Sequence, residues 1–251
     1  MGHDDASMQS FTTVSVFSIA ILSFVALGAG PSSAATIAQI RDDYDAHTPV
    51  ATETSAGKIA DTHGTGAWDF YGSASLGGAL TPSTYDVAAG QDAYAVVGQV
   101  QGHPGITSNA FWGPAPPADG LALHPGKHNQ AIQFLVVRWT AGIGSVGTFN
   151  IAGVLTNEPG ASDGVTLDIW LNGFSEFNTT ASANSTEAYD LDLTVVAGDT
   201  VDFIIGNNTT WNNDRSSFSA TITGTPIPEP STGLLAVLGL AGLIGTRRRR
   251  A

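Results

Sequence analysis

Cysteine is absent from this chain of 251 residues, and basic side chains are scarce. Without cysteine the protein cannot form disulfides, thiolate metal sites or a cysteine nucleophile. Lys and Arg number only 9 against 22 Asp and Glu, and residues 36–225 keep 5 of those basic and 19 of those acidic residues. A surface this acidic repels phosphate backbones, which excludes nucleic acid as a partner, and it attracts cations such as calcium.

Glycine is plentiful instead, with 30 residues, while charged residues make up only 12% of the chain. Together with many Thr, Ser, Asn and Val residues, this composition favours strands joined by turns. Because no disulfide can staple the fold, the middle of the chain must be held together by burial alone. At roughly 190 residues it is long enough for that.

The first 35 residues have the pattern of a secretory signal peptide. An apolar run over residues 14–30 is followed by small side chains. Among them, Ser33 and Ala35 supply the small residues that a signal peptidase requires at the third and first positions before its cut. No Lys or Arg precedes the run, which departs from the usual pattern, and a start at Met8 would discard the aspartates in front of it. A buried helix of the fold is the alternative, but the small residues favour a signal helix that is removed with residues 1–35.

The last 26 residues combine a glutamate between two prolines, an apolar segment and a basic cluster. These parts are Pro228, Glu229 and Pro230, then residues 233–246, then Arg247, Arg248, Arg249 and Arg250. The prolines stop regular structure from running into the site and leave it extended for a processing enzyme. As a helix the apolar segment would span about 21 Å, less than a hydrocarbon core of about 30 Å, which suits transient membrane insertion. The arginines would hold the end on the cytoplasmic face.

These three parts resemble the PEP-CTERM sorting signal, although they cover only a tenth of the chain. The resemblance implies recognition by an exosortase-type enzyme and removal of the tail. It also implies delivery to the cell surface, outer membrane or extracellular matrix of a Gram-negative-type bacterium that makes exopolysaccharide. An ordinary tail anchor with a basic stop is the alternative, but it does not require a Pro-Glu-Pro-Ser-Thr sequence at this spacing.

Residues 36–225 predict one all-β domain, a single antiparallel β-sandwich that is jelly-roll-like, between the signal helix and a C-terminal hydrophobic helix. Residues 36–126 form a loop-rich half with many turn signals and a helical turn over residues 37–44. Its short apolar stretches, at residues 67–71, 94–100 and 106–112, predict short strands between long loops. Residues 127–223 alternate between apolar and polar with a period of two, as strands do. The expected strands cover residues 131–140, 146–155, 165–172, 189–195, 200–205 and 218–222. Trp139 is expected in the core.

Part of this domain resembles a second, looser group, the β-sandwich cargo domains that precede such tails in planctomycete-like bacteria. The matching stretches are residues 123–126, 137–140, 163–165, 171–173 and 196–203. The shape is similar to that of carbohydrate-binding modules. This resemblance implies a fold more than a ligand, because sandwiches host many functions.

The histidines and carboxylates predict no catalytic or metal site. His124 and His128 are four residues apart, but the Pro-Gly pair between them forbids the helix that would align them, and His103 lies in another loop. Glycosidases use a pair of carboxylates, and no pair stands out among Asp168, Glu176, Asp190, Asp192, Asp199 and Asp202. No Gly-x-Ser-x-Gly elbow is present for a serine hydrolase.

The richest binding motif is a loop over residues 206–214. It gathers Trp211, Asn212, Asn213 and Asp214, which together offer a flat aromatic face and amide and carboxylate groups, as sugar sites do. Trp170, on the polar face of its strand, is a further candidate contact. Backbone oxygens with Asp163 and Asp214 could instead hold calcium, and the remaining interpretation is a polar turn with its indole folded onto the rim of the sandwich.

The sequence therefore predicts a non-catalytic exported protein of a polysaccharide-rich surface or matrix that binds glycan through these residues. Its processing partners would be a signal peptidase and an exosortase-type enzyme. The alternatives are a secreted hydrolase of matrix glycans and a structural surface or biofilm protein that binds no small ligand.

Overall fold

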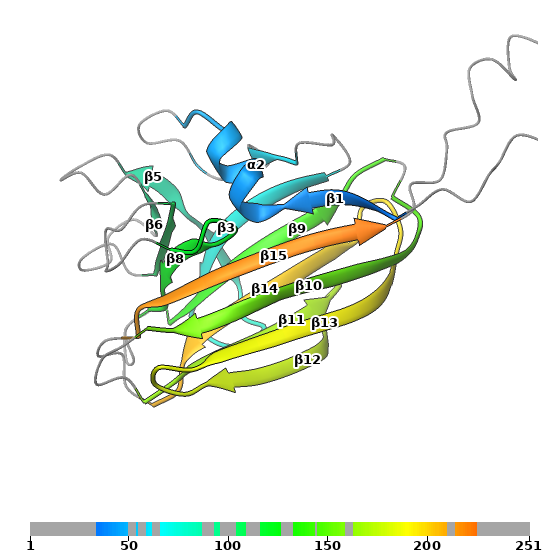
Figure 1. The fold of residues 1–251 in the computed structure, drawn as a ribbon. Helices are drawn as coiled ribbons and strands as arrows, with labels where there is room; N and C mark the ends of the chain where they lie inside the picture. Colours follow the sequence, from blue (N-terminus) through cyan, green and yellow to red (C-terminus); the bar gives the residue numbers. More distant parts are fainter. Residues whose placement is uncertain are drawn as a thin grey trace, which may run out of the picture. The chain divides into compact units, whose positions relative to one another are not determined.

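The computed structural model of the protein describes part of the chain. The described residues are 34–49, 54, 59–61, 66–86, 93–95, 104–108, 116–126, 133–143, 145–158, 163–209 and 214–224. They form two antiparallel sheets and one short helix (Figure 1). The prediction of an all-β sandwich is confirmed.

The first sheet has eight strands. In order across the sheet they are β13 (Thr186–Val195), β10 (Gly147–Asn157), β15 (Ser216–Gly224), β8 (Leu121–His124), β7 (Gly105–Thr107), β6 (Ala93–Ala95) and β5 (Thr84–Asp86), with β1 (Ala35–Gln39) also pairing with β15. The second sheet has seven strands. They are β12 (Phe174–Ala181), β11 (Val165–Leu171), β14 (Thr200–Asn207), β9 (Phe134–Ala141), β3 (Gly66–Ser73) and β2 (Ile59–Ala60), with β4 (Leu80–Pro82) also pairing with β3.

The strands from β8 to β15 have jelly-roll connections. The first sheet contains the order β8-β15-β10-β13 and the second the order β9-β14-β11-β12, so the chain crosses between the sheets at most of its turns. This is the arrangement of eight strands in two interlocked Greek keys. The jelly-roll-like topology predicted from the sequence is therefore confirmed.

The core lies between the two sheets and is rich in aromatic side chains. Phe203 of β14 is fully buried, and its ring centroid lies 5.2 Å from that of Phe218 on the facing sheet. Tyr189 of the first sheet lies 6.0 Å from Phe203, and Trp139 of the second lies 6.3 Å from Phe149 of the first. Burial between the sheets therefore takes the place of disulfides, and the expectation that Trp139 is a core residue is confirmed.

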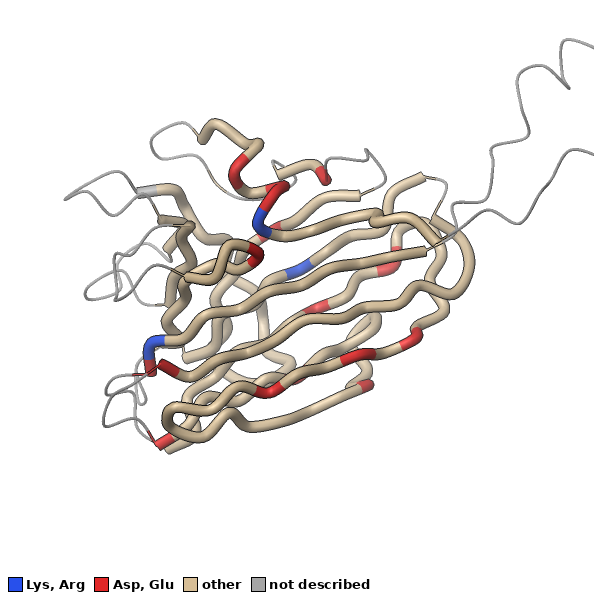
Figure 2. The backbone as a smooth tube through the Cα atoms, in the orientation of Figure 1, with Lys and Arg blue, Asp and Glu red and all other residues tan. Residues whose placement is uncertain are grey.

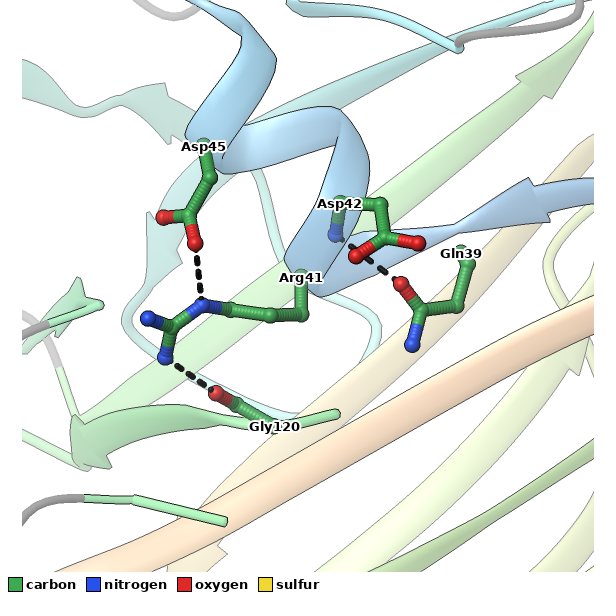
Figure 3. A network of polar contacts seen from close by, with 5 residues as sticks. All are labelled: Gln39, Arg41, Asp42, Asp45 and Gly120. Atoms are coloured by element: carbon green, nitrogen blue, oxygen red, sulfur yellow. Dashed lines mark hydrogen bonds and ion pairs between the residues drawn. The ribbon is translucent and has the colours of Figure 1, made fainter. Parts of the chain in front are cut away.

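The helix α2 (Ile40–Ala46) is tied to the first sheet by polar contacts (Figure 3). The side chain of Gln39 caps it by accepting a hydrogen bond of 2.9 Å from the backbone N of Asp42. Arg41 forms an ion pair of 2.5 Å with Asp45 and donates a 3.0 Å hydrogen bond to the backbone carbonyl of Gly120 beside β8. These contacts fix the helix against the start of a strand 79 residues further along the chain.

The helical turn expected over residues 37–44 is placed too early, because β1 occupies the residues up to Gln39. Ile37 and Ala38 are buried where β1 pairs with β15, so tertiary pairing extends a segment with a local helical pattern. The helix begins at Ile40, three residues after the expected start, and carries Asp43 into the interior. There the carboxylate accepts a 2.8 Å hydrogen bond from the buried indole N–H of Trp68.

Five of the six expected strands match β9, β10, β11, β14 and β15 within a few residues, and the sixth expectation covers most of β13. The edge strand β12 was not expected from its sequence. The signal helix and the C-terminal hydrophobic helix lie outside the described residues. Within those residues, no helix has both the length and the apolar character needed to cross a membrane.

Candidate ligand-binding site

A row of polar and aromatic side chains crosses the outer face of the second sheet. The strand register places Asp69 of β3 opposite Arg138 of β9, Arg138 opposite Asp202 of β14, and Asp202 opposite Trp170 of β11. On β14 these outward positions alternate with the core residues. Four strands thus bring two carboxylates, one guanidinium and one indole to a common face.

A loop over residues 74–79, between β3 and β4, folds across this face, and we call it the covering loop. At Gly77 the backbone φ is +68°, and an added Cβ would lie 2.7 Å from the Trp170 ring. Glycine is needed there both for the left-handed backbone and for the close approach. Val136 of β9 and Ile204 of β14 also point outward on this face, yet they are only 1% and 4% exposed. The covering loop, which starts from β3 on the other side of β9, lies over them.

Between the covering loop and the sheet lies a cavity of about 410 Å³. Its walls combine apolar, aromatic and hydrogen-bonding groups. The lining includes Trp170, Arg138, Asp202, Asn172, Thr200 and Gly77. This volume lies within the range of roughly 300–1,000 Å³ that is usual for small-molecule sites.

The charged centre of the cavity is a two-point ion pair. Arg138 donates from Nε to Asp202 Oδ1 at 2.6 Å and from Nη2 to Oδ2 at 2.7 Å. These hydrogen bonds raise the pKa of the Arg138 guanidinium, which also lies 5.6 Å from the centre of the Tyr71 ring. Burial raises the pKa of the Tyr71 hydroxyl, and the nearby Asp69 adds to the rise. The pair presents fixed donors and acceptors with little net charge.

Trp170 contributes a half-buried ring to the wall. Its Nε1 is buried and has no hydrogen-bond partner of ordinary geometry among the described residues. Burial raises the pKa of the Asp168 carboxyl, and an interaction with the Trp170 side chain offsets part of that rise. Since the Trp170 N–H is not held in ordinary hydrogen-bond geometry, it is suited to donate to a ligand oxygen.

One end of the cavity is held by the turn at Asn172 and Gly173. Both residues have positive φ, of 51° and 85°, as in a two-residue hairpin turn between β11 and β12. The Asn172 amide donates to Asp199 Oδ1, and its oxygen accepts from the backbone N of Thr200, both at 2.9 Å. This wall is therefore preorganised by its own hydrogen bonds.

Of the ligand-binding residues that the sequence predicted, the structure places Trp170 in the cavity wall. Trp211, Asn212 and Asn213 lie outside the described residues. Asp214 is fully buried. The described residues therefore do not test whether the predicted set comes together, and its binding role stays a prediction.

Sequence reasoning did not single out Arg138, Asp202, Asn172 and Thr200 as one site. The outward direction of each of these side chains could be predicted from its own strand. The register that aligns β9, β14 and β11 could not, because it is set by long-range pairing.

The calcium prediction also stays open. The Asp163 carboxylate accepts hydrogen bonds from both the backbone N and the hydroxyl of Thr209, so it anchors Thr209 of the 206–214 loop. Among the described residues no three acidic or histidine side chains cluster as a metal site would require.

His124 is a buried histidine, only 6% exposed, and its Nδ1 lies 2.7 Å from the Pro125 carbonyl as a donor. Burial lowers its pKa below the ordinary value of 6.5. As the pH falls through 6.5, the unfolded chain takes up a proton that the folded chain resists, so the free energy of unfolding falls.

We expect His124→Gln to reduce this loss of stability. Between pH 7.5 and 5.5 the free energy of unfolding of the variant should fall by up to about 1.4 kcal/mol less than that of the wild type. Urea unfolding at the two pH values measures the difference. If both proteins lose the same stability, His124 does not titrate between the folded and unfolded states as described.

Comparison with known proteins identifies the C-terminal segment. Residues 226–250 match the PEP-CTERM protein-sorting motif. This range contains every sorting residue predicted from the sequence, namely Pro228, Glu229, Pro230, Arg247, Arg248, Arg249 and Arg250. The chain is therefore an exported, surface-sorted bacterial protein with a β-sandwich cargo domain. At the other end, Ala35 is the exposed first residue of β1, and Ser33 lies outside the described residues.

No characterised protein matches the chain by sequence. Among solved structures, a family 51 carbohydrate-binding module from Clostridium perfringens in complex with methyl-galactose is 9% identical, with a TM-score of 0.32, over 76% of this chain and 92% of that one. A family 35 module from Clostridium thermocellum is 10% identical, with a TM-score of 0.28, over 47% and 95%. A family 36 module in complex with calcium and xylotriose is 17% identical, with a TM-score of 0.26, over 43% and 82%. At these values the likeness does not extend to a ligand.

Proposed function

We propose that this protein is a non-catalytic component of a polysaccharide-rich cell surface or extracellular matrix in a Gram-negative-type bacterium, and that it binds glycan in the cavity under the covering loop. An exosortase-type enzyme would remove the tail, and a signal peptidase would cut after Ala35. The sorting motif supports export and sorting to the cell surface. The observation that carries glycan binding is the cavity itself.

The lining has the chemistry that a sugar ring requires. Trp170 offers an aromatic surface and a buried N–H that makes no hydrogen bond of ordinary geometry to the described residues, while Arg138, Asp202 and Thr200 offer donors and acceptors for hydroxyl groups. The ion pair is satisfied internally, which favours a neutral sugar over a strongly charged ligand. The volume of about 410 Å³ suits one or two sugar units.

Trp170→Ala is expected to weaken binding to cell-derived polysaccharides by about tenfold or more, because it removes the apolar contact surface of the ring. Affinity electrophoresis or calorimetry on a panel of such glycans measures the change, and a matched unfolding midpoint checks the fold. Phe174→Ala is the control, since that ring is 73% exposed and does not line the cavity.

The same assay separates the alternatives. Loss of binding in Trp211→Ala but not in Trp170→Ala would transfer the site to the 206–214 loop, and loss on addition of a chelator would support the calcium prediction. Release of reducing sugar from the panel would favour a hydrolase. If the wild type self-associates and binds none of the glycans, the structural alternative holds.

A further inference from the structure

The chain enters and leaves the sandwich at one end. Ala35 of β1 pairs with Gly224, the last residue of β15. Val195 at the end of β13 pairs with Gly147 at the start of β10, which itself runs beside the end of β15. The connections β9–β10 and β13–β14 therefore lie beside the point from which the tail departs (Figure 1).

We call this end of the domain the tail end, and we define it by the described residues of three loops, namely 142, 143, 145, 146, 172–174 and 196–199. Its loops are linked by backbone hydrogen bonds from Gly198 to the Ala141 carbonyl and from Ala141 to the Asp199 carbonyl. The Asn172 side chain joins the third loop to them by its hydrogen bond to Asp199.

Exposed apolar side chains concentrate at the tail end. Ile143 is 89% exposed, Phe174 73%, Val196 47% and Val146 42%. These are four of the five large hydrophobic residues that are exposed in the described part of the chain, and the fifth is Leu76 on the covering loop. Isolated exposed apolar residues need no explanation, but a cluster on one surface marks an interaction site.

Charged side chains are scarce in these three loops. Among the described residues of the tail end, Asp199 is the one charged side chain. Its carboxylate accepts hydrogen bonds from the backbone N of Val196 at 2.8 Å and from the Asn172 amide at 2.9 Å. Elsewhere the chain is strongly acidic, and red positions run along the long strands and the helix in Figure 2. An apolar end on an acidic protein points to a partner that offers apolar surface.

The apolar surface closest to the tail end is the bilayer that the chain's own tail would enter. The apolar segment of the tail begins at Gly233, so only residues 225–232 separate it from the end of β15. At about 3.5 Å per residue this linker reaches about 30 Å at most. A bilayer that holds the tail is therefore within a short tether of the tail end, and such a tether raises the effective concentration to the millimolar range.

We propose that the tail end is a membrane-docking surface, which lies against the lipid bilayer while the tail is inserted. Ile143 and Val196 would enter the interfacial region, with Val146 and Phe174 beside them. The proposal does not depend on glycan binding, and it rests on entry of the tail into a bilayer. It gives the sorted precursor a preferred orientation, with the chain termini of the domain facing the membrane.

Single-cysteine labelling tests this orientation. The chain has no cysteine, so one introduced thiol is a unique site for a polarity-sensitive fluorophore. The full chain would be reconstituted in phosphatidylcholine vesicles that contain lipid-attached quenchers, with Ile143→Cys or Val196→Cys as the probe. Ser182→Cys is the matched control, because it is an exposed turn residue between β12 and β13 at the opposite end. Ala236→Cys reports insertion of the tail.

Labels at residues 143 and 196 are expected to be quenched at least threefold more than the label at residue 182, with emission shifted to shorter wavelength. Equal quenching at the two ends of the sandwich would overturn the proposal. An unquenched label at residue 236 would overturn it as well, since the tail would then not hold the domain at a bilayer. The quenching at the tail end, at residue 182 and at residue 236 should be unchanged even if Trp170→Ala abolishes glycan binding.

Discussion

Phe203→Ala is expected to destabilise the protein by about 3–5 kcal/mol, which is a large share of the roughly 5–15 kcal/mol that stabilises a typical domain. Phe203 is fully buried at the centre of the core. Its ring contacts Trp68 in its own sheet and Tyr189 and Phe218 in the facing sheet, at centroid distances of 6.2, 6.0 and 5.2 Å. Truncation would leave a cavity between the sheets, and no disulfide limits the unfolded chain.

Urea unfolding followed by tryptophan fluorescence measures this loss, because Trp68 and Trp139 are both buried. Phe174→Ala removes the same ring from a site that is 73% exposed, and its effect should stay within about 0.5 kcal/mol. Phe203→Leu should fall between the two, since it retains most of the apolar volume. Equal effects at residues 203 and 174 would show that the core between the sheets does not carry the stability.

The long strands that pack against this core could be predicted because their own residues alternate. In β11, Val165, Leu167 and Ile169 are fully buried, and the polar residues between them point outward. In β13, Asp190 and Asp192 are exposed as expected for the solvent face. Period-two burial is a local pattern, so it is readable from the sequence alone.

The elements that the sequence did not reveal depend on distant partners. Strand β12 has mostly exposed residues and a polar sequence, so it carries no apolar alternation. The Asn172–Gly173 pair in front of it is a hairpin signal that could have indicated it. Strand β3 is a different case, because the apolar stretch at residues 67–71 predicts a short strand there, and the structure confirms it. Its place beside β9, about 70 residues further along the chain, could not be predicted, since long-range pairing sets it.

The candidate site follows the same rule. Trp170 was identifiable because an indole on the polar face of a strand is unusual. Its neighbours in the cavity were not, because Arg138 and Asp202 are 64 residues apart and meet only through the register of β9 and β14. The covering loop that closes the cavity crosses two strands before Gly77 reaches Trp170, and no local pattern encodes that contact.

Arg138→Met should therefore be costly, by about 2–4 kcal/mol. Removing one partner leaves the Asp202 carboxylate, which is 9% exposed, without its counter-charge under the covering loop. The loss is smaller than the roughly 3–5 kcal/mol of a fully buried pair, because 26% of the Arg138 side chain is exposed and water can reach it.

The double variant Arg138→Met with Asp202→Leu distinguishes two contributions to the loss. One is the lost attraction between the two side chains, and the other is the cost of leaving the Asp202 carboxylate without a counter-charge. If the unpaired Asp202 carboxylate causes most of the loss, the double variant should be more stable than Arg138→Met, since no uncompensated charge remains opposite β9. Asp45→Ala is the surface control, because its pair with Arg41 is 45% exposed at the carboxylate and should contribute less than about 1 kcal/mol. A double variant as unstable as Arg138→Met would contradict this account and would assign the loss to the contact between the Arg138 guanidinium and the Tyr71 ring.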